Sequence, residues 1–218
     1  MKYNTAVFDL DGTLLDTLGD LRNSVNFALE KNGFPKRTTE EIRAFVGNGI
    51  RLLIERAVPE NTPIQEIDRC FEDFKMHYKD NSAVLTKPYD KIIDVLNELR
   101  DNGVKTAVVS NKADFAVKSL VDFYFPNLFD CAFGEREGIR RKPSPDAVLG
   151  ALKEIGADTD KAVYIGDSDV DIETARNSNL PCIAVTWGFR DKSVLEELTP
   201  EYIIDRPQDI SNIILKEV

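Results

Sequence analysis

Short apolar runs alternate with longer amphipathic stretches along most of this chain. The runs cover residues 5–8, 104–109, 131–133, 162–165, 182–185 and 202–204, and each has the length of a buried strand. Between residues 90 and 102, Ile92, Leu96 and Leu99 recur at helical spacing, and Gly103 follows where a helix C-cap is expected. Such alternation is typical of a parallel sheet covered by helices. We therefore predict an α/β fold with a central parallel sheet.

The stretch after the first apolar run has a different pattern. From about residue 17 to residue 83, several helical patterns follow one another and no strand pattern occurs. Turn signals at Asn32-Gly33, at Gly47-Asn48-Gly49 and at residues 59–63 separate these patterns. This organisation predicts an all-helical domain, residues 17–85, inserted into a core made of residues 1–16 and 86–218.

Composition limits the classes of partner. With 218 residues and 42% apolar content, the chain has enough apolar side chains to bury a full core. A formal net charge of -10 disfavours nucleic acid and anionic membranes as partners. No apolar run reaches membrane-spanning length and the start lacks a secretory pattern, so we expect a cytoplasmic protein. We expect it to be a monomer or a homodimer. The cysteines, Cys70, Cys131 and Cys182, are expected to be buried free thiols.

Two carboxylates stand one residue apart at the end of the first apolar run. In a strand, Asp9 and Asp11 point to the same side while Leu10 enters the core. Such a pair repels itself unless a cation, a shared proton or hydrogen bonds compensate. One carboxylate could attack a substrate while the other moves a proton. The alternative is a strand end with solvated acids, in which Asp11-Gly12 is an ordinary turn.

Two polar clusters follow later strands, at the edge where open α/β sheets bind ligands. Ser110 and Asn111, followed by Lys112, could hold an anion together with the N–H groups of the next helix, or Ser110 could simply cap that helix. Lys142 lies in a loop stiffened by prolines and could pair with a phosphate. A solvated basic turn is the alternative for this loop.

A third cluster of acids follows the strand predicted at residues 162–165. Asp167, Asp169 and Asp171 lie in a strand-to-helix turn, and hard cations such as Mg²⁺ prefer carboxylate oxygens. An acid here could complete a metal site begun by Asp9. Because a helix N-terminus favours acids in any case, we assign Asp169 a structural role.

These clusters, in this order and each after a predicted strand, resemble the four motifs of the haloacid dehalogenase superfamily. The resemblance implies a Rossmann-like core, an inserted helical cap and Mg²⁺-dependent hydrolysis of a small phosphate monoester. It implies that Asp9 is the nucleophile, forming an aspartyl-phosphate, and that Asp11 is the acid and base. It further implies that Ser110, Asn111 and Lys142 hold phosphate, that Asp9, Asp11 and Asp167 bind Mg²⁺, and that Asp171 orients the metal or Lys142.

Substrate choice is expected in the helical insertion. Residues 45–51, which include Gly47, Asn48 and Arg51, resemble the cap segment of phosphoglycolate phosphatases. Arg51 could meet a substrate carboxylate, or it could be an exposed arginine beside a turn. Other small-molecule phosphatases, acting on pyrophosphate, nucleotides or sugar phosphates, are the first alternative. A β-phosphoglucomutase-like phosphomutase and a non-catalytic phospho-ligand sensor are the others.

Overall fold

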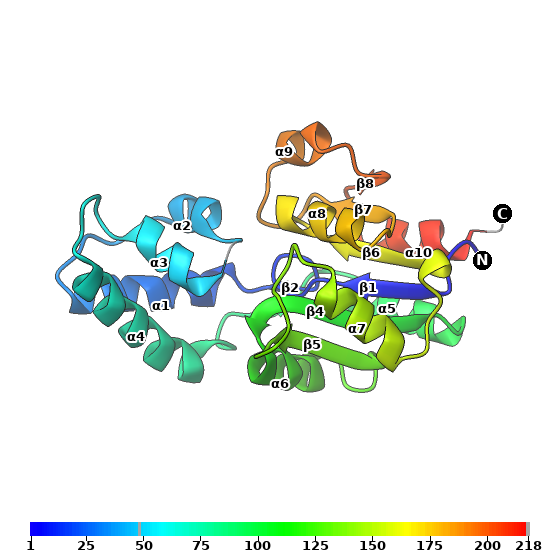
Figure 1. Cartoon of the computed structure of the whole chain (residues 1–218), viewed down its shortest axis with the longest axis horizontal. Coiled ribbons are helices and arrows are strands. Elements are labelled where there is room, and N and C mark those ends of the chain that lie inside the picture. Colours follow the sequence, from blue (N-terminus) through cyan, green and yellow to red (C-terminus); the bar gives the residue numbers. More distant parts are fainter. Residues whose placement is uncertain (48, 217–218) are drawn as a thin grey trace. The chain divides into compact units, whose positions relative to one another are not determined.

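The computed structural model describes residues 1–47 and 49–216 of the chain (Figure 1). These residues form two compact units. The first comprises Met1–Leu15 and Pro88–Val218, and we call it the α/β unit. The second comprises Asp16–Lys87, and we call it the helical unit.

Six strands of the described α/β unit form one parallel sheet, as the sequence pattern predicts. The sheet has the order β5-β4-β1-β6-β7-β8. Two very short strands, β2 and β3, form a separate pair. The strands are β1 (Thr5–Phe8), β2 (Leu15–Asp16), β3 (Lys87–Pro88), β4 (Lys105–Ala113), β5 (Cys131–Glu135), β6 (Ala162–Gly166), β7 (Cys182–Val185) and β8 (Tyr202–Ile204).

Helices cover both faces of this sheet, and each face has its own apolar core (Figure 1). Successive strand residues point alternately into the two cores. Phe8 belongs to the core with α5, α6 and α10, whereas Val7 belongs to the core with α7 and α8. The strands therefore read as continuous apolar runs because both of their faces are buried. The helices are α5 (Ile92–Asp101), α6 (Asp114–Tyr124), α7 (Asp146–Glu154), α8 (Asp169–Asn177), α9 (Lys192–Glu197) and α10 (Gln208–Leu215), with a 3-10 turn at Thr159–Lys161.

The strand order reverses at β1, which lies between β4 and β6. Phe8, the last residue of β1, is level with Val108 of β4 and Ile165 of β6. The residues that follow these positions therefore meet at one edge of the sheet, where open α/β sheets form a crevice.

The helical unit consists of α1 (Leu18–Lys31), α2 (Thr39–Phe45), α3 (Ile50–Ala57) and α4 (Ile64–Asn81). Its own apolar core includes the fully buried Val25, Leu29, Ile54 and Phe74. A capping box between Thr38 and Glu41 fixes the start of α2. The apolar residues that recur at helical spacing are therefore buried against one another within this unit.

Two further observations concern the chain as a whole. Within residues 1–47 and 49–216, no helix combines the length and the apolar content that crossing a membrane requires. Cys70, Cys131 and Cys182 are buried free thiols, as expected from their number and spacing.

Candidate active site

Three carboxylates and one ammonium meet at the crevice of the α/β unit. Oxygens of Asp9, Asp167 and Asp171 lie within 4.8 Å of one another. The Lys142 side chain reaches the same place from the loop before α7, and only 4% of it is exposed. Asp9 is 8% exposed, so the alternative of solvated acids is wrong for Asp9, as is that of a solvated turn for Lys142.

Lys142 uses all three of its N–H donors in this cluster. Its Nζ lies 2.7 Å from Asp9 Oδ1, 2.8 Å from Asp171 Oδ1 and 3.1 Å from the hydroxyl of Tyr164. Burial by itself would lower the pKa of Lys142, but the facing carboxylates of Asp171 and Asp9 raise this pKa well above its usual value. Lys142 is therefore a permanent cation at the end of Asp9.

The side chain of Asn111 fixes the peptide group of Lys142. Asn111 Oδ1 accepts a hydrogen bond from Lys142 N at 2.8 Å, and Asn111 Nδ2 donates to Lys142 O at 3.1 Å. These two bonds connect β4 to the loop that carries Lys142. The sequence analysis expects Asn111 to hold phosphate, and the structure shows that its side chain holds the peptide group of Lys142.

Asp171 is enclosed by donors. Its Oδ1 accepts from Lys142 and from the Tyr164 hydroxyl, and its Oδ2 accepts from Ser168 N at 3.1 Å and Ser168 Oγ at 2.6 Å. The Ser168 contacts form the capping box that begins α8. With four donors at its two oxygens, Asp171 is placed to orient Lys142.

Asp167 is held in a second way. Its Oδ1 accepts from Thr13 Oγ1 at 3.1 Å and its Oδ2 accepts from Phe189 N at 2.7 Å. Burial raises the pKa of Asp167 to about 7, and the nearby Asp171 adds to the effect. A Cβ on Gly12 would lie 2.4 Å from Asp167 Oδ2, so only glycine fits beside this carboxylate.

The charge balance of the cluster suits a cation. Burial and the charge of Asp171 raise the pKa of Asp9 well above its usual value, although Lys142 works in the opposite direction. Three carboxylates against one ammonium leave an excess of negative charge among buried groups. Each carboxylate oxygen has two lone pairs, so Asp9 and Asp167 keep acceptor capacity beyond their protein partners. This oxygen donor set fits a hard divalent metal ion.

Ser110 and Asp11 lie at the same edge of the sheet. The alternative in which Ser110 caps the next helix is wrong, because β4 continues through Ala113 and α6 begins only at Asp114. Ser110 Oγ instead accepts from Lys112 N at 3.2 Å. Asp11 is partly exposed and lies against the buried Lys112, whose Nζ is 2.9 Å from Asp11 Oδ1.

Two of the residues predicted in the insertion, Gly47 and Arg51, lie between α2 and α4 of the helical unit. Gly47 has a φ of 133°, a conformation that suits glycine. Asn48 lies outside the described residues. Arg51, on α3, forms ion pairs with Glu55 and Asp68, so two acids of its own unit engage its guanidinium.

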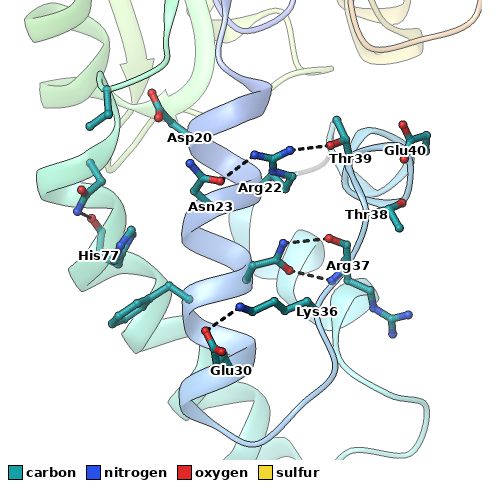
Figure 2. A pocket seen from close by; sticks show the side chains of 14 residues that line it. Asp20, Arg22, Asn23, Glu30, Lys36, Arg37, Thr38, Thr39, Glu40 and His77 are labelled. Atoms are coloured by element: carbon teal, nitrogen blue, oxygen red, sulfur yellow. Dashed lines mark hydrogen bonds and ion pairs between the residues drawn. The ribbon is translucent and has the colours of Figure 1, made fainter.

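A separate hollow lies on the helical unit (Figure 2). It has a volume of about 760 Å³, and its polar side chains bond to one another. Arg22 donates to Thr39 Oγ1 at 3.0 Å, and Lys36 pairs with Glu30 at 3.0 Å. Its histidine, His77, bonds to Ser24 Oγ and stacks on Phe27. The charged side chains of this hollow thus have partners of opposite charge or hydrogen-bond partners, whereas three carboxylates lie close together in the acid cluster of the α/β unit.

Sequence reasoning missed the side chains that support the cluster. Tyr164 is fully buried in β6, and its hydroxyl bonds to Lys142 and Asp171. A phenol within an otherwise apolar strand was the available signal, since a buried Tyr hydroxyl needs a partner. Thr13 carried no comparable signal, because its contact with Asp167 spans 154 positions of the chain.

Comparison with known proteins agrees with this geometry. Residues 6–185 match the family model of haloacid dehalogenase-like hydrolases. A phosphoglycolate phosphatase of Aquifex aeolicus is 32% identical over 94% of this chain and 93% of its own. A phosphoglycolate phosphatase of Agrobacterium fabrum is 35% identical over 92% of this chain and 87% of its own.

The fold comparison covers the whole chain. A crystal structure of a protein from Lactobacillus delbrueckii subsp. bulgaricus is 40% identical to it, with a TM-score of 0.95 over 100% of both chains. The family match covers all the clustered residues from Asp9 to Asp171. The chain belongs to the haloacid dehalogenase-like hydrolases.

Proposed function

We propose that this protein is a Mg²⁺-dependent phosphatase that hydrolyses a small phosphate monoester, with 2-phosphoglycolate as the leading substrate. The observation that carries the proposal is the contact of Lys142 with Asp9 beside Asp167. It supports the proposal because a cation and a carboxylate that could hold a metal ion lie next to an acid that could attack phosphorus. The curated relatives named phosphoglycolate phosphatase support the choice of substrate.

In the first step, an oxygen of Asp9 attacks the phosphorus atom and the bond to the leaving oxygen breaks. The electron pair stays on that oxygen, which takes a proton from the carboxyl group of Asp11. The product is an alcohol and an aspartyl-phosphate on Asp9. Attack by an anion on an anionic phosphate is unfavourable, and Lys142 and Ser110 offset the charge.

In the second step, water attacks the aspartyl-phosphate and gives a proton to the Asp11 carboxylate. The bond between phosphorus and Asp9 breaks, inorganic phosphate leaves, and both acids return to their starting forms. Asp11 therefore acts once as acid and once as base. Mg²⁺, held by Asp9, Asp167 and the backbone carbonyl of Asp11, would supply further positive charge at the phosphate oxygens.

We assign the α/β unit the catalytic role and the helical unit the role of a cap that selects the substrate. Gly47, Asn48 and Arg51 stay predictions for that selection. The presence of Asp11 favours a catalytic protein over a non-catalytic phospho-ligand sensor, because a sensor needs no acid two residues after Asp9.

The test is phosphate release from a panel of metabolites, with Mg²⁺ and with excess chelator. The panel includes 2-phosphoglycolate, pyrophosphate, nucleotides and hexose phosphates. We expect Mg²⁺-dependent release with 2-phosphoglycolate as the best substrate. Preference for a much larger substrate would overturn the substrate assignment, and interconversion of hexose phosphates without phosphate release would indicate a mutase. No turnover of any substrate would overturn the activity itself.

A further inference from the structure

A second buried ammonium contacts an acid of the candidate site, and the proposed reaction as written assigns it no role. The side chain of Lys112 is 5% exposed, and its Nζ lies 2.9 Å from Oδ1 and 3.2 Å from Oδ2 of Asp11. The two lysines thus contact different acids: Lys142 contacts Asp9 and Asp171, whereas Lys112 contacts both oxygens of Asp11.

The position of Lys112 follows from the length of β4. This strand continues through Ala113, with a shift in its pairing to β5 between Val109 and Ala113, so Lys112 lies in the irregular last part of the strand. Its backbone N–H donates to Ser110 Oγ at 3.2 Å. From this position the Lys112 side chain reaches Asp11.

Asp11 needs such support more than Asp9 does. Asp9 follows the central strand directly and its N–H bonds to Ile165 O at 2.9 Å, whereas Asp11 belongs to the turn that follows. The Asp11 side chain is 19% exposed, against 11% for Asp9. A carboxyl group in a turn loses efficiency as an acid unless something fixes its direction.

We propose that Lys112 is a positioning residue for Asp11, holding both carboxyl oxygens so that the group faces the leaving oxygen in the first step and water in the second. This inference rests on the proposed phosphatase mechanism. Burying an ammonium is costly without a close partner, and the contact with both oxygens supplies one. The same contact restricts rotation of the carboxyl group, which a single hydrogen bond would leave free.

The proposal predicts a kinetic signature that depends on the leaving group. Nitrophenolate leaves without help from an acid, whereas an alkoxide such as that from ethyl phosphate needs a proton in the transition state. In Lys112→Met, formation of the phosphoenzyme should stay fast with p-nitrophenyl phosphate but fall about 100-fold with ethyl phosphate or 2-phosphoglycolate. The second step should slow with every substrate, because it needs Asp11 as a base.

The experiment is a rapid-mixing measurement of nitrophenol release with Mg²⁺ present. Lys112→Met should give a burst approaching one nitrophenol per protein, followed by a slow steady state, and KM for p-nitrophenyl phosphate should fall together with kcat because the phosphoenzyme accumulates. Asp11→Ala should give the same burst with a slower steady state. Lys118→Met removes an exposed lysine that pairs with Asp114 on α6, and it should behave as the wild type. If Lys112→Met folds poorly, Lys112→Gln, which retains an N–H donor, gives the same readout.

The outcomes separate the two proposals. A burst in Asp11→Ala but none in Lys112→Met, with both steps slowed equally, would overturn only the positioning role. Unchanged kinetics in Lys112→Met would do the same. A rise in KM for 2-phosphoglycolate but not for ethyl phosphate would mean that Lys112 binds the substrate carboxylate. Full activity in Asp11→Ala would overturn the proposed mechanism itself.

Discussion

Lys142 Nζ lies 2.7 Å from Oδ1 of Asp9, and neither side chain is more than 11% exposed. The lysine is therefore in direct contact with the carboxylate that we propose attacks phosphorus. Asp171 and Tyr164 hold the Lys142 ammonium, and the Asn111 side chain holds its peptide group. A phosphate group that binds here would therefore meet a cation that is already oriented. Such preorganisation costs no reorganisation of the protein when negative charge spreads over the phosphate oxygens.

This arrangement makes Asp9→Asn the most direct test of the nucleophile. The amide has nearly the same volume as the carboxylate but is a very poor nucleophile, so phosphate release with Mg²⁺ should fall at least about 1,000-fold. The fold should persist, because the neutral amide relieves repulsion among the buried acids. Phosphate release and thermal unfolding, measured on the same preparation, check both expectations. Turnover near the wild-type rate in a folded variant would remove Asp9 from its role.

Metal binding should be visible without any substrate. A ligand that binds only the folded state stabilises it by about 2.7 kcal/mol at 100 times its Kd. For a chain of this size, that corresponds to an increase in Tm of roughly 5–10 °C. We expect Mg²⁺ to raise the Tm of the wild-type protein and to leave that of Asp167→Asn nearly unchanged.

A neighbouring acid provides the control for this measurement. Asp169 is only two residues from Asp167, but it is partly exposed and its carboxylate pairs with Arg190 at 2.8 Å. Asp169→Asn should keep the full increase in Tm with Mg²⁺. An equal loss in both variants would indicate a general effect of negative charge in this turn rather than a site at Asp167.

The sequence was sufficient to predict the parallel sheet and the helical insertion, because both follow from local apolar periodicity. It also identified the strand ends that carry Asp9 and Asp167. It did not predict the full length of β4, since Ser110, Asn111 and Lys112 are polar and lack the apolar pattern of a buried strand. Ala113 pairs with Glu135 of β5 after a shift in register, and nothing local to residues 110–113 encodes that pairing.

Contacts between distant segments were the other limit of the sequence. The bond from Lys112 to Asp11 joins residues 101 positions apart, and the bond from Lys142 to the Tyr164 hydroxyl joins a loop to strand β6. Sequence position gives the side of a strand on which a residue lies, but not which of several nearby acids its side chain reaches. Such pairings depend on packing across the sheet edge, and they appear only in three dimensions.

Gly12 offers a test of how closely the backbone approaches Asp167. Its φ is +87°, and an added Cβ would lie 2.4 Å from Asp167 Oδ2. Gly12→Ala should therefore lose about 1 kcal/mol through backbone strain and more through the displaced carboxylate. Gly103→Ala is the matched control, because Gly103 has a φ of +73° but open space around the Cβ position. Urea unfolding should show the larger loss for Gly12→Ala, and the Mg²⁺-induced increase in Tm should disappear only there. Equal losses would mean that Asp167 moves aside at no cost.

Asp20 connects the start of α1 to Thr86, near the other end of the helical unit in the chain, and its removal should destabilise that unit. It lies in the first turn of α1, is 1% exposed, and its Oδ2 accepts from Thr86 N and Thr86 Oγ1, both at 2.8 Å. Asp20→Ala removes these charge-assisted bonds and a favourable charge at a helix N-terminus, so we expect a loss of about 3 kcal/mol in unfolding free energy. Asp20→Asn keeps one acceptor oxygen and should lose about half as much. Glu72→Ala, which removes an exposed ion pair with Lys75, should cost less than about 1 kcal/mol. Urea unfolding followed by circular dichroism measures all three, and equal stability of Asp20→Ala and Glu72→Ala would show that the buried bonds contribute no more than the surface pair.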